Sequence, residues 1–433
     1  MLSDKEINIE QGAASPLKSN GNEPQPRQEP SSIPNGGLAA WSQVLGAHLL
    51  FFNSWGIVNT YGAYQAYYES DLLRSRSSSE ISWIGTFQGF LLIFFSIVGG
   101  PIFDRGYIRP LLMAGTFLTV FGMMMTSLAT TYWQIFLAQG LCVGLGCGCL
   151  FLPSVAIVAT YFSTRRALAT GVTAAGGSLG SVIYPIIFRR LQPQVGAGWA
   201  TRIIAFIALA TLSISVLIAK PRLPPSKKSR RLVDPDAFKS SLFVLYNLGS
   251  FFAFVGLYIP FFYLIIYAHR KIGIADDISF YLLSVINASS IFGRIIPGLL
   301  ADRFGALEVS SFCALACAVL SYSWIAIDNL GGLIVFCILY GFFSGAVVSL
   351  PPTVIATLVP SLEVVGTWMG MSFTAGATGL LIGNPIAGLL IDVEAGEFAR
   401  GFIFAASMIM AATVIYLIIL VAKRRRERRL SKD

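Results

Sequence analysis

Charged residues are scarce in this chain: Asp, Glu, Lys and Arg make up 12% of its 433 residues. Water-soluble domains carry about 25%, so this shortage excludes an ordinary soluble fold. Only two histidines are present, His48 and His269, and neither has the sequence neighbours of a metal site or a catalytic triad. The chain also lacks the phosphate-binding pattern G-x-x-x-x-G-K-[ST], so it has no visible means of ATP-driven pumping. We therefore expect no enzyme, no cofactor and no metal.

Apolar residues take the place of charge. They form 55% of the chain, and the mean hydropathy is +0.69. A bilayer core of about 30 Å needs about 20 apolar residues per helix, and windows of that kind recur along the sequence. They predict an all-α membrane protein with twelve transmembrane helices, at residues 40–66, 82–103, 110–130, 133–160, 168–190, 200–219, 241–268, 278–301, 309–327, 332–357, 366–391 and 401–422.

Hydrophilic segments divide this apolar sequence. We expect a disordered cytoplasmic N-tail at 1–34, a six-helix bundle at 35–219, a basic cytoplasmic linker at 220–240, a second six-helix bundle at 241–422, and a basic cytoplasmic C-tail at 423–433. Much of the net charge of +9 lies in the linker and the C-tail, where it orients the spans rather than binding nucleic acid. The positive-inside rule then places both termini in the cytoplasm, and we expect a multi-pass protein of the plasma membrane with the lipid bilayer as its partner.

The second half of the chain repeats motifs of the first. The pattern G-x-x-x-D-R ends span 2 as Gly100 to Arg105 and span 8 as Gly298 to Arg303, 198 residues apart. Leu-Pro recurs at the same offset in spans 4 and 10, as Leu152-Pro153 and Leu350-Pro351. A duplication of this kind predicts two six-helix pseudo-repeats that rock about a central site. In each repeat we expect the Asp to be favoured by the dipole of the helix that follows it.

Arg294 is the one Lys or Arg placed clearly inside a predicted span. An intramembrane Arg costs at least ~2.5 kcal/mol on insertion scales, so it normally faces a watery cavity and finds a partner. Asn287 and Ser290 share its helix face, and a guanidinium suits a carboxylate. We therefore expect Arg294 to attract an anionic cargo; the alternative is that its side chain reaches the membrane surface.

Polar residues also form stripes on span 1. Asn53 and Tyr64 belong to one stripe and Asn59 to another, and at least one should face a cavity or a neighbouring helix. We take these three residues, with Tyr258 of span 7, as candidate substrate contacts. The alternative is that the amides only hold helices together.

These motifs resemble the major facilitator superfamily, through the paired G-x-x-x-D-R segments, and within it the monocarboxylate porter family, especially its fungal branch. The segment Tyr161 to Gly176 resembles the second porter signature, Y-F-x-K-R-R-x-L-A-x-G-x-A-x-A-G, with departures at Thr164 and Thr173. The first signature is looser, because Asn35 stands where Asp is expected. The resemblance covers about Asn35 to the end of span 12.

The resemblance implies transport by alternating access. In lactate–proton members a span 1 Lys and a span 8 Asp carry proton and substrate; the matching positions here are Asn59 and Ser290, while Arg294 is kept. This departure argues against lactate–proton symport and leaves proton coupling and direction open. The expected cytoplasmic gate consists of Asp104, Arg105, Arg165, Arg166, Asp302 and Arg303.

We therefore expect a secondary active transporter of a small organic acid, anion or related metabolite. Efflux of a larger, partly apolar metabolite is an alternative, favoured by Phe251, Phe254 and Tyr258 in span 7. A nutrient sensor that keeps the fold without transporting is a third, against which the short C-tail argues.

Overall fold

A computed structural model describes residues 34–222, 232–392 and 395–430 of the chain. The predicted N-tail, apart from Pro34, and the basic linker residues Lys227, Lys228, Arg230 and Arg231 lie outside these residues. Throughout the described part the secondary structure is helical, with one isolated bridge between Asp392 and Glu397.

The first half consists of eight α-helices and two π-helical segments. They are α1 (Gly37–Asn59), α2 (Tyr61–Tyr67), η1 (Tyr68–Leu72, π), α3 (Ser78–Phe94), α4 (Ser96–Asp104), α5 (Ile108–Thr126), α6 (Tyr132–Ile135), η2 (Phe136–Val143, π), α7 (Gly144–Tyr161) and α8 (Arg166–Ile218).

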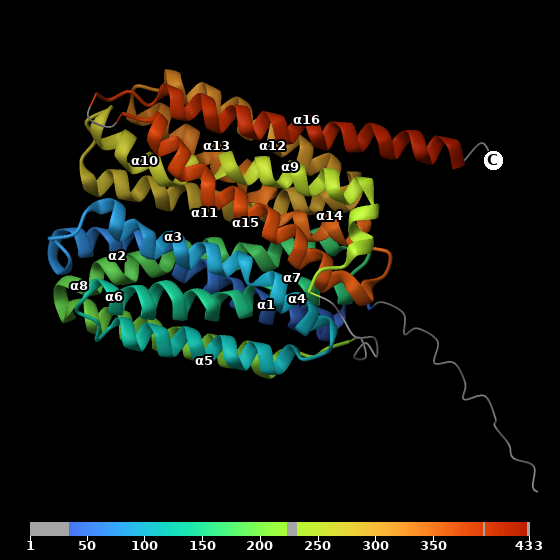
Figure 1. The fold of residues 1–433 in the computed structure, drawn as a ribbon, viewed down its shortest axis with the longest axis horizontal. Helices are drawn as coiled ribbons and strands as arrows, with labels where there is room; N and C mark the ends of the chain where they lie inside the picture. Colours follow the sequence, from blue (N-terminus) through green and yellow to red (C-terminus); the bar gives the residue numbers. More distant parts are fainter. Residues whose placement is uncertain (1–33, 223–231, 393–394, 431–433) are drawn as a thin grey trace, which may run out of the picture. The chain divides into compact units, whose positions relative to one another are not determined.

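The second half begins after a 3-10 turn, η3 (Pro235–Lys239). Its elements are α9 (Ser241–Leu257), α10 (Ile259–Arg270), α11 (Asp276–Phe304), α12 (Ala306–Ser323), η4 (Trp324–Ala326), α13 (Leu330–Ser349), α14 (Pro351–Leu358), η5 (Leu362–Val364), α15 (Val365–Leu390) and α16 (Ala399–Leu430). In Figure 1 the blue-to-green helices of the first half and the yellow-to-red helices of the second form two adjoining groups.

The prediction of twelve spans is confirmed. Ten helical stretches among the described residues are long and apolar enough to cross a membrane. One of them, α8, contains two spans, because its 53 residues are interrupted at Gly196, where a φ of 80° turns the chain back. The twelfth span is α1, in which Gln43, His48 and Asn53 lower the hydropathy. The outer surface carries large exposed apolar side chains, such as Phe117 on α5 and Leu389 on α15, as expected of helices in contact with lipid.

The C-terminal span continues further than expected. The sequence places its end at residue 422, but α16 runs on as a helix to Leu430. The added residues are almost all Lys, Arg and Glu, which are strong helix formers, so the helix does not need the bilayer to persist.

Two pairs of helices join the halves. The first part of α8 packs along α11, and α3 and α4 pack along α15. The first contact joins spans 5 and 8, and the second joins spans 11 and 2. Because span 11 repeats span 5 and span 8 repeats span 2, the two contacts are equivalent under the internal duplication.

Candidate substrate pocket and gate

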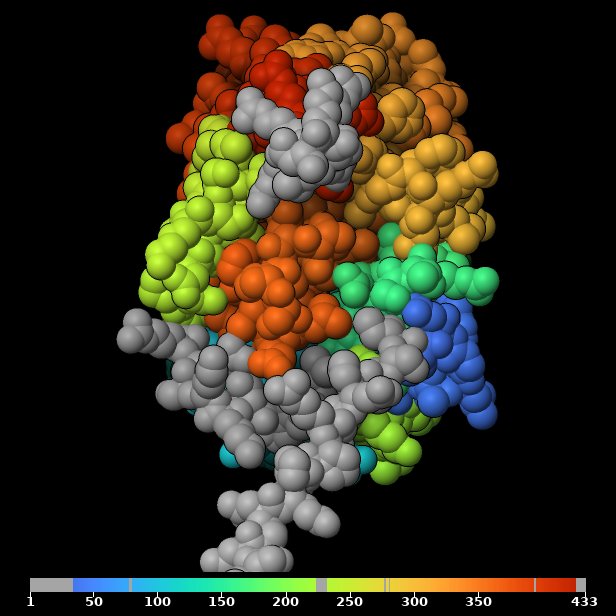
Figure 2. Space-filling view, turned by 90° about the vertical axis from the view of Figure 1, so that its right-hand side faces the viewer, coloured from blue at the N-terminus to red at the C-terminus, as the bar shows by residue number. Residues whose placement is uncertain are grey.

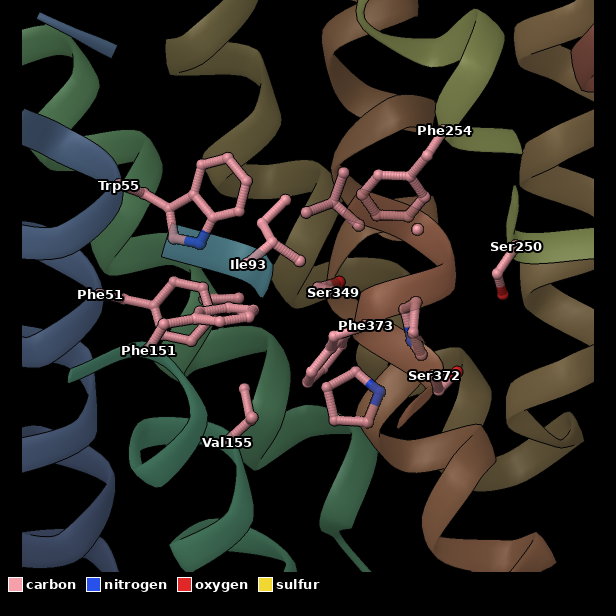
Figure 3. A pocket seen from close by; sticks show the side chains of 15 residues that line it. Phe51, Trp55, Ile93, Phe151, Val155, Ser250, Phe254, Ser349, Ser372 and Phe373 are labelled. Atoms are coloured by element: carbon pink, nitrogen blue, oxygen red, sulfur yellow. The ribbon is translucent and has the colours of Figure 1, made fainter. Parts of the chain in front are cut away.

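A small pocket lies between the two halves (Figure 3). The first half contributes side chains from α1, α3, α7 and α8, and the second from α9, α13, α14 and α15. Its aromatic walls are formed by Phe51, Trp55, Phe151, Phe254 and Phe373. A pocket at the contact of two repeats is where the duplicated sequence predicts a central site.

The polar groups of this pocket are neutral. Ser250, Ser349 and Ser372 contribute hydroxyls, and no charged side chain is among the described residues that line it. The hydroxyl of Ser250 lies 3.3 Å from that of Tyr416. The chemistry of the walls therefore suits a partly apolar molecule with a few neutral polar atoms.

Aromatic rings connect the halves beside and within the pocket. Trp55 of α1 lies parallel to Tyr258 of α9, with ring centroids 6.2 Å apart and an interplanar angle of 7°. Phe151 of α7 contacts Phe373 of α15, with centroids 5.0 Å apart. These contacts must be lost or rearranged whenever the halves separate.

Arg294 lies behind the pocket wall and bridges the halves. Its side chain is 7% exposed. Its Nε donates to Ser290 Oγ at 3.2 Å, and a terminal nitrogen donates to the carbonyl of Ala174 in α8 at 2.7 Å. Ser290 Oγ also lies 2.9 Å from Ser178 Oγ of α8. Among the described residues Arg294 makes no ion pair with a carboxylate.

This geometry differs from an arginine that reaches the membrane surface. The backbone carbonyl and the serine hydroxyl satisfy part of the guanidinium, and its other N–H groups have no protein partner within the described chain. Ala174 lines the pocket, so one residue separates the charge from the pocket space. Asn287, on the same face, donates to Leu283 of its own helix.

The polar residues of span 1 contact neighbouring helices of their own half. Asn53 donates to Thr211 Oγ1 at 2.9 Å and accepts from the hydroxyl of Tyr184 at 2.7 Å. Asn59 donates to Ser181 Oγ at 2.7 Å, and Tyr64 donates to Thr201 Oγ1 at 3.0 Å. None of these three candidates is among the residues that line the pocket; each joins α1 or α2 to α8.

The two motif aspartates connect the halves at the end of the molecule that carries the linker. Asp302, at the end of α11, accepts from the backbone N–H groups of Ala167 and Leu168, in the first turn of α8, at 2.8 and 2.9 Å. Such N-terminal N–H groups have no partner within their own helix, and the positive end of the helix dipole favours a carboxylate. Asp302 therefore caps a helix of the opposite half.

Asp104 makes the equivalent contact in the other direction. It is 9% exposed and accepts from the N–H of Gly366 at 3.0 Å and from the N–H and hydroxyl of Thr367 at 2.8 and 2.6 Å. We call these two contacts the reciprocal caps. We expected each aspartate to be stabilised by the dipole of the helix that follows it in the sequence. Each carboxylate instead caps the fifth span of the other half, α15 for Asp104 and α8 for Asp302. Figure 2 shows this face, with the start of α15 (orange) beside the α7–α8 connection (green).

The arginines expected at the gate lie around the reciprocal caps. Arg105, Arg165 and Arg303 are exposed, and the guanidinium of Arg303 lies over the ring of Phe304. Arg166 is half-buried and donates to the carbonyl of Phe162 at 2.9 Å. The carboxylates bridge the halves through backbone N–H groups and, for Asp104, also through the hydroxyl of Thr367.

Close backbone approach accompanies both caps. A Cβ on Gly171 of α8 would lie 2.1 Å from the carbonyl oxygen of Arg294, and a Cβ on Gly370 of α15 would lie 2.3 Å from that of Ser96. Ser96 and Arg294 occupy equivalent positions of the repeat, 198 residues apart. Glycine is thus required where the two halves meet at these points.

Sequence reasoning missed Phe51, Phe151 and Phe373 of the pocket walls. An apolar helix presents aromatic side chains to lipid as readily as to a cavity, so composition gives no signal for them. The sequence did contain a signal for the capped residues. Gly366 and Thr367 begin span 11 just as Ala167 and Leu168 begin span 5, so the two pairs occupy equivalent positions of the repeat.

Comparison with known proteins identifies the family. The model of the Major Facilitator Superfamily matches residues 44–360 and, in an overlapping match, 276–433. The MFS-type transporter dbaD of Emericella nidulans is 44% identical over 83% of this chain and 80% of its own. The aspyridones efflux protein apdF of the same fungus is 40% identical over 90% of this chain and 79% of its own. These names describe MFS-type transport and efflux and do not specify monocarboxylates.

Among solved structures, the fucose:proton symporter FucP of E. coli shares the fold. It aligns with a TM-score of 0.66 over 87% of this chain and 98% of its own, at 16% identity. The duplicated helices, the pocket between the halves and the family match agree with one another. The chain belongs to the Major Facilitator Superfamily and is a multi-pass membrane transporter.

Proposed function

We propose that this transporter exports a partly apolar organic metabolite by alternating access of its two six-helix bundles, 35–219 and 241–422. The observation that carries the proposal is the pocket between the bundles, whose walls are aromatic and uncharged. A relative that is 40% identical is named as an efflux protein for aspyridones, which supports export rather than uptake.

The reciprocal caps serve in this proposal as the gate on the linker face. Asp104 and Asp302 each hold the opposite half by backbone N–H groups, so both caps must break before that face opens. Arg105, Arg165, Arg166 and Arg303 surround the caps, and their positive charges attract the two carboxylates.

We further propose that the linker face is cytoplasmic and that the protein resides in the plasma membrane. Exposed Lys423, Arg424 and Arg425 follow the last span on that face, which fits the positive-inside rule. No ATP-binding motif is present, so an ion gradient, with protons as the first candidate, would supply the energy.

The test is a metabolite comparison inside and outside fungal cells, between a strain lacking the gene and an overexpressing strain. Export predicts that at least one metabolite accumulates inside the deletion strain and appears in the medium of the overexpressing strain. Identical profiles in the two strains would contradict the proposal.

A second candidate is transport of an organic acid or anion, including a monocarboxylate, favoured by the unpaired buried charge of Arg294. An anion that enters the space beside Ala174 could pair with the remaining N–H groups of Arg294, with Ser290 and Asn287 on the same helix face. The segment 161–176, which resembles a porter signature, also supports it.

The variant Arg294→Gln separates the two candidates, with Arg400→Gln, an exposed arginine at the start of α16, as the control. If the cargo is anionic, loss of a buried ion pair predicts a drop in its transport of at least about 100-fold, from roughly 3 kcal/mol. Transport that survives Arg294→Gln at the level of Arg400→Gln excludes the anion candidate.

A further inference from the structure

The indole of Trp55 carries a buried donor without an acceptor. The side chain is 5% exposed, and its Nε1 has no hydrogen-bond partner among the described residues. A buried indole N–H usually finds a partner, because an unsatisfied buried donor destabilises the folded protein. The ring of Phe151 stands at 80° to the indole with centroids 5.9 Å apart; a π face is a weaker acceptor than an oxygen atom.

This donor belongs to the wall of the central pocket. Figure 3 shows the indole at the pocket with its nitrogen edge turned, in this view, toward Phe51 and Ile93. From the opposite half, Ser372 of α15 lines the same pocket, and its hydroxyl has no protein partner within the described chain. Two side chains of this pocket, one from each half, thus carry a neutral donor that has no acceptor among the described residues.

The walls also restrict the shape and charge of an occupant. Five aromatic side chains line the pocket, and flat rings pack well against aromatic faces, with an attraction beyond that of burial alone. When the halves part, the contacts of Trp55 with Tyr258 and of Phe151 with Phe373 are lost, and an aromatic occupant would replace them. No charged side chain lines the space in the described part of the chain, so an ionised group in it would be costly.

We propose that the cargo is a planar, conjugated ring molecule with an uncharged carbonyl oxygen that accepts a hydrogen bond from Nε1 of Trp55. Its ring packs among the phenylalanines of the pocket, and the hydroxyl of Ser372 is a second donor for it. This inference rests on the proposed function, because it takes the pocket to be the cargo site, and it adds the chemical class of the cargo and a residue that selects it.

The test uses the purified full chain in lipid nanodiscs and three probes with one ring frame. Fluorene is flat and has no acceptor, 9-fluorenone adds one carbonyl, and fluorene-9-carboxylate adds a charge. Dissociation constants are measured for the parent, for Trp55→Phe, which keeps a ring and removes the N–H, and for Trp324→Phe. Trp324 is the matched control, because its Nε1 is also buried without a partner, but it packs against Phe336 and Phe402 away from the pocket.

We expect the preference for 9-fluorenone over fluorene to be about 3- to 10-fold larger in the parent and in Trp324→Phe than in Trp55→Phe, as one net hydrogen bond of about 0.5–1.5 kcal/mol allows. Each probe partitions into lipid equally in all three samples, so partitioning cancels when the preference is compared between the proteins.

Four results would overturn the inference. They are equal binding of 9-fluorenone by the parent and Trp55→Phe, a preference for 9-fluorenone over fluorene that is no larger in the parent than in Trp55→Phe, tighter binding of the carboxylate than of the ketone, or failure of all three probes to bind. The metabolite comparison between strains is independent of these probes. If metabolites are exported while the probes fail, only the cargo class is wrong; if the strains do not differ, the proposed export is wrong as well.

Discussion

Removal of the reciprocal caps should shift the transporter toward a state that is open on the linker face. Asp104 accepts three hydrogen bonds from the other half and is 9% exposed, whereas Asp302 accepts two and is half-buried. When the face opens, water replaces these bonds, so each contributes roughly 1 kcal/mol net. Asp104→Ala should therefore weaken the closed state by about 3 kcal/mol and Asp302→Ala by about 2 kcal/mol, factors of roughly 150 and 30.

The shift can be measured as a distance between the halves. Spin labels on Tyr107→Cys, between α4 and α5, and on Phe304→Cys, at the end of α11, report the separation of the two halves by pulsed electron resonance, because both residues are exposed on the linker face. Five of the six native cysteines are buried, so labelling should favour the introduced sites. Asp71→Ala is the control, because it removes a carboxylate whose pairing with Arg74 at 3.9 Å is exposed and therefore weak.

The expected order is a larger population of long distances in Asp104→Ala than in Asp302→Ala, and additive free energies in the double variant, since both caps act on one equilibrium. The reasoning is refuted if both single variants keep the distance distribution of the parent, or if Asp302→Ala has the larger effect.

Two further predictions concern the contact between the halves and the core of the first half. Gly171→Ala should distort the packing of α8 against α11 and slow transport at least about tenfold, because its Cβ would lie 2.1 Å from the carbonyl oxygen of Arg294. Gly62→Ala, with nothing within 4 Å, should transport normally in the same assay, and equal rates for both would contradict the close approach. Asn53→Ala should lower thermal stability by about 2 kcal/mol, because the Tyr184 hydroxyl and Thr211 lose their partner. The affinity for cargo should stay unchanged. A weaker affinity without loss of stability would instead make Asn53 a cargo contact.

Much of this fold could be predicted from the sequence, because lipid imposes a simple length and composition on each span. The duplication was visible for a related reason: Gly100 and Gly298 allow close approach, and Asp104 and Asp302 cap helices, so both copies keep the same residues at one spacing. The family resemblance also led to the correct superfamily.

The neighbours of each residue could not be predicted in the same way. A helical wheel groups Asn53 and Tyr64 on one face but does not say whether that face meets water or another helix, and here it meets α8. Likewise, the partners of Asp104 lie more than 260 residues away in the chain, in a half whose docking no local pattern encodes.

The reciprocal caps also affect how quickly a carrier of this kind can work. Both hold the linker face closed, so in an exporter whose linker side meets the cytoplasm, that face must open spontaneously before the solute can enter from inside the cell. Saturating amounts of solute would then leave turnover limited by that opening. Weakening a cap by a modest amount should accordingly raise the maximal transport rate, and it should also let more solute cross without coupling to the ion gradient.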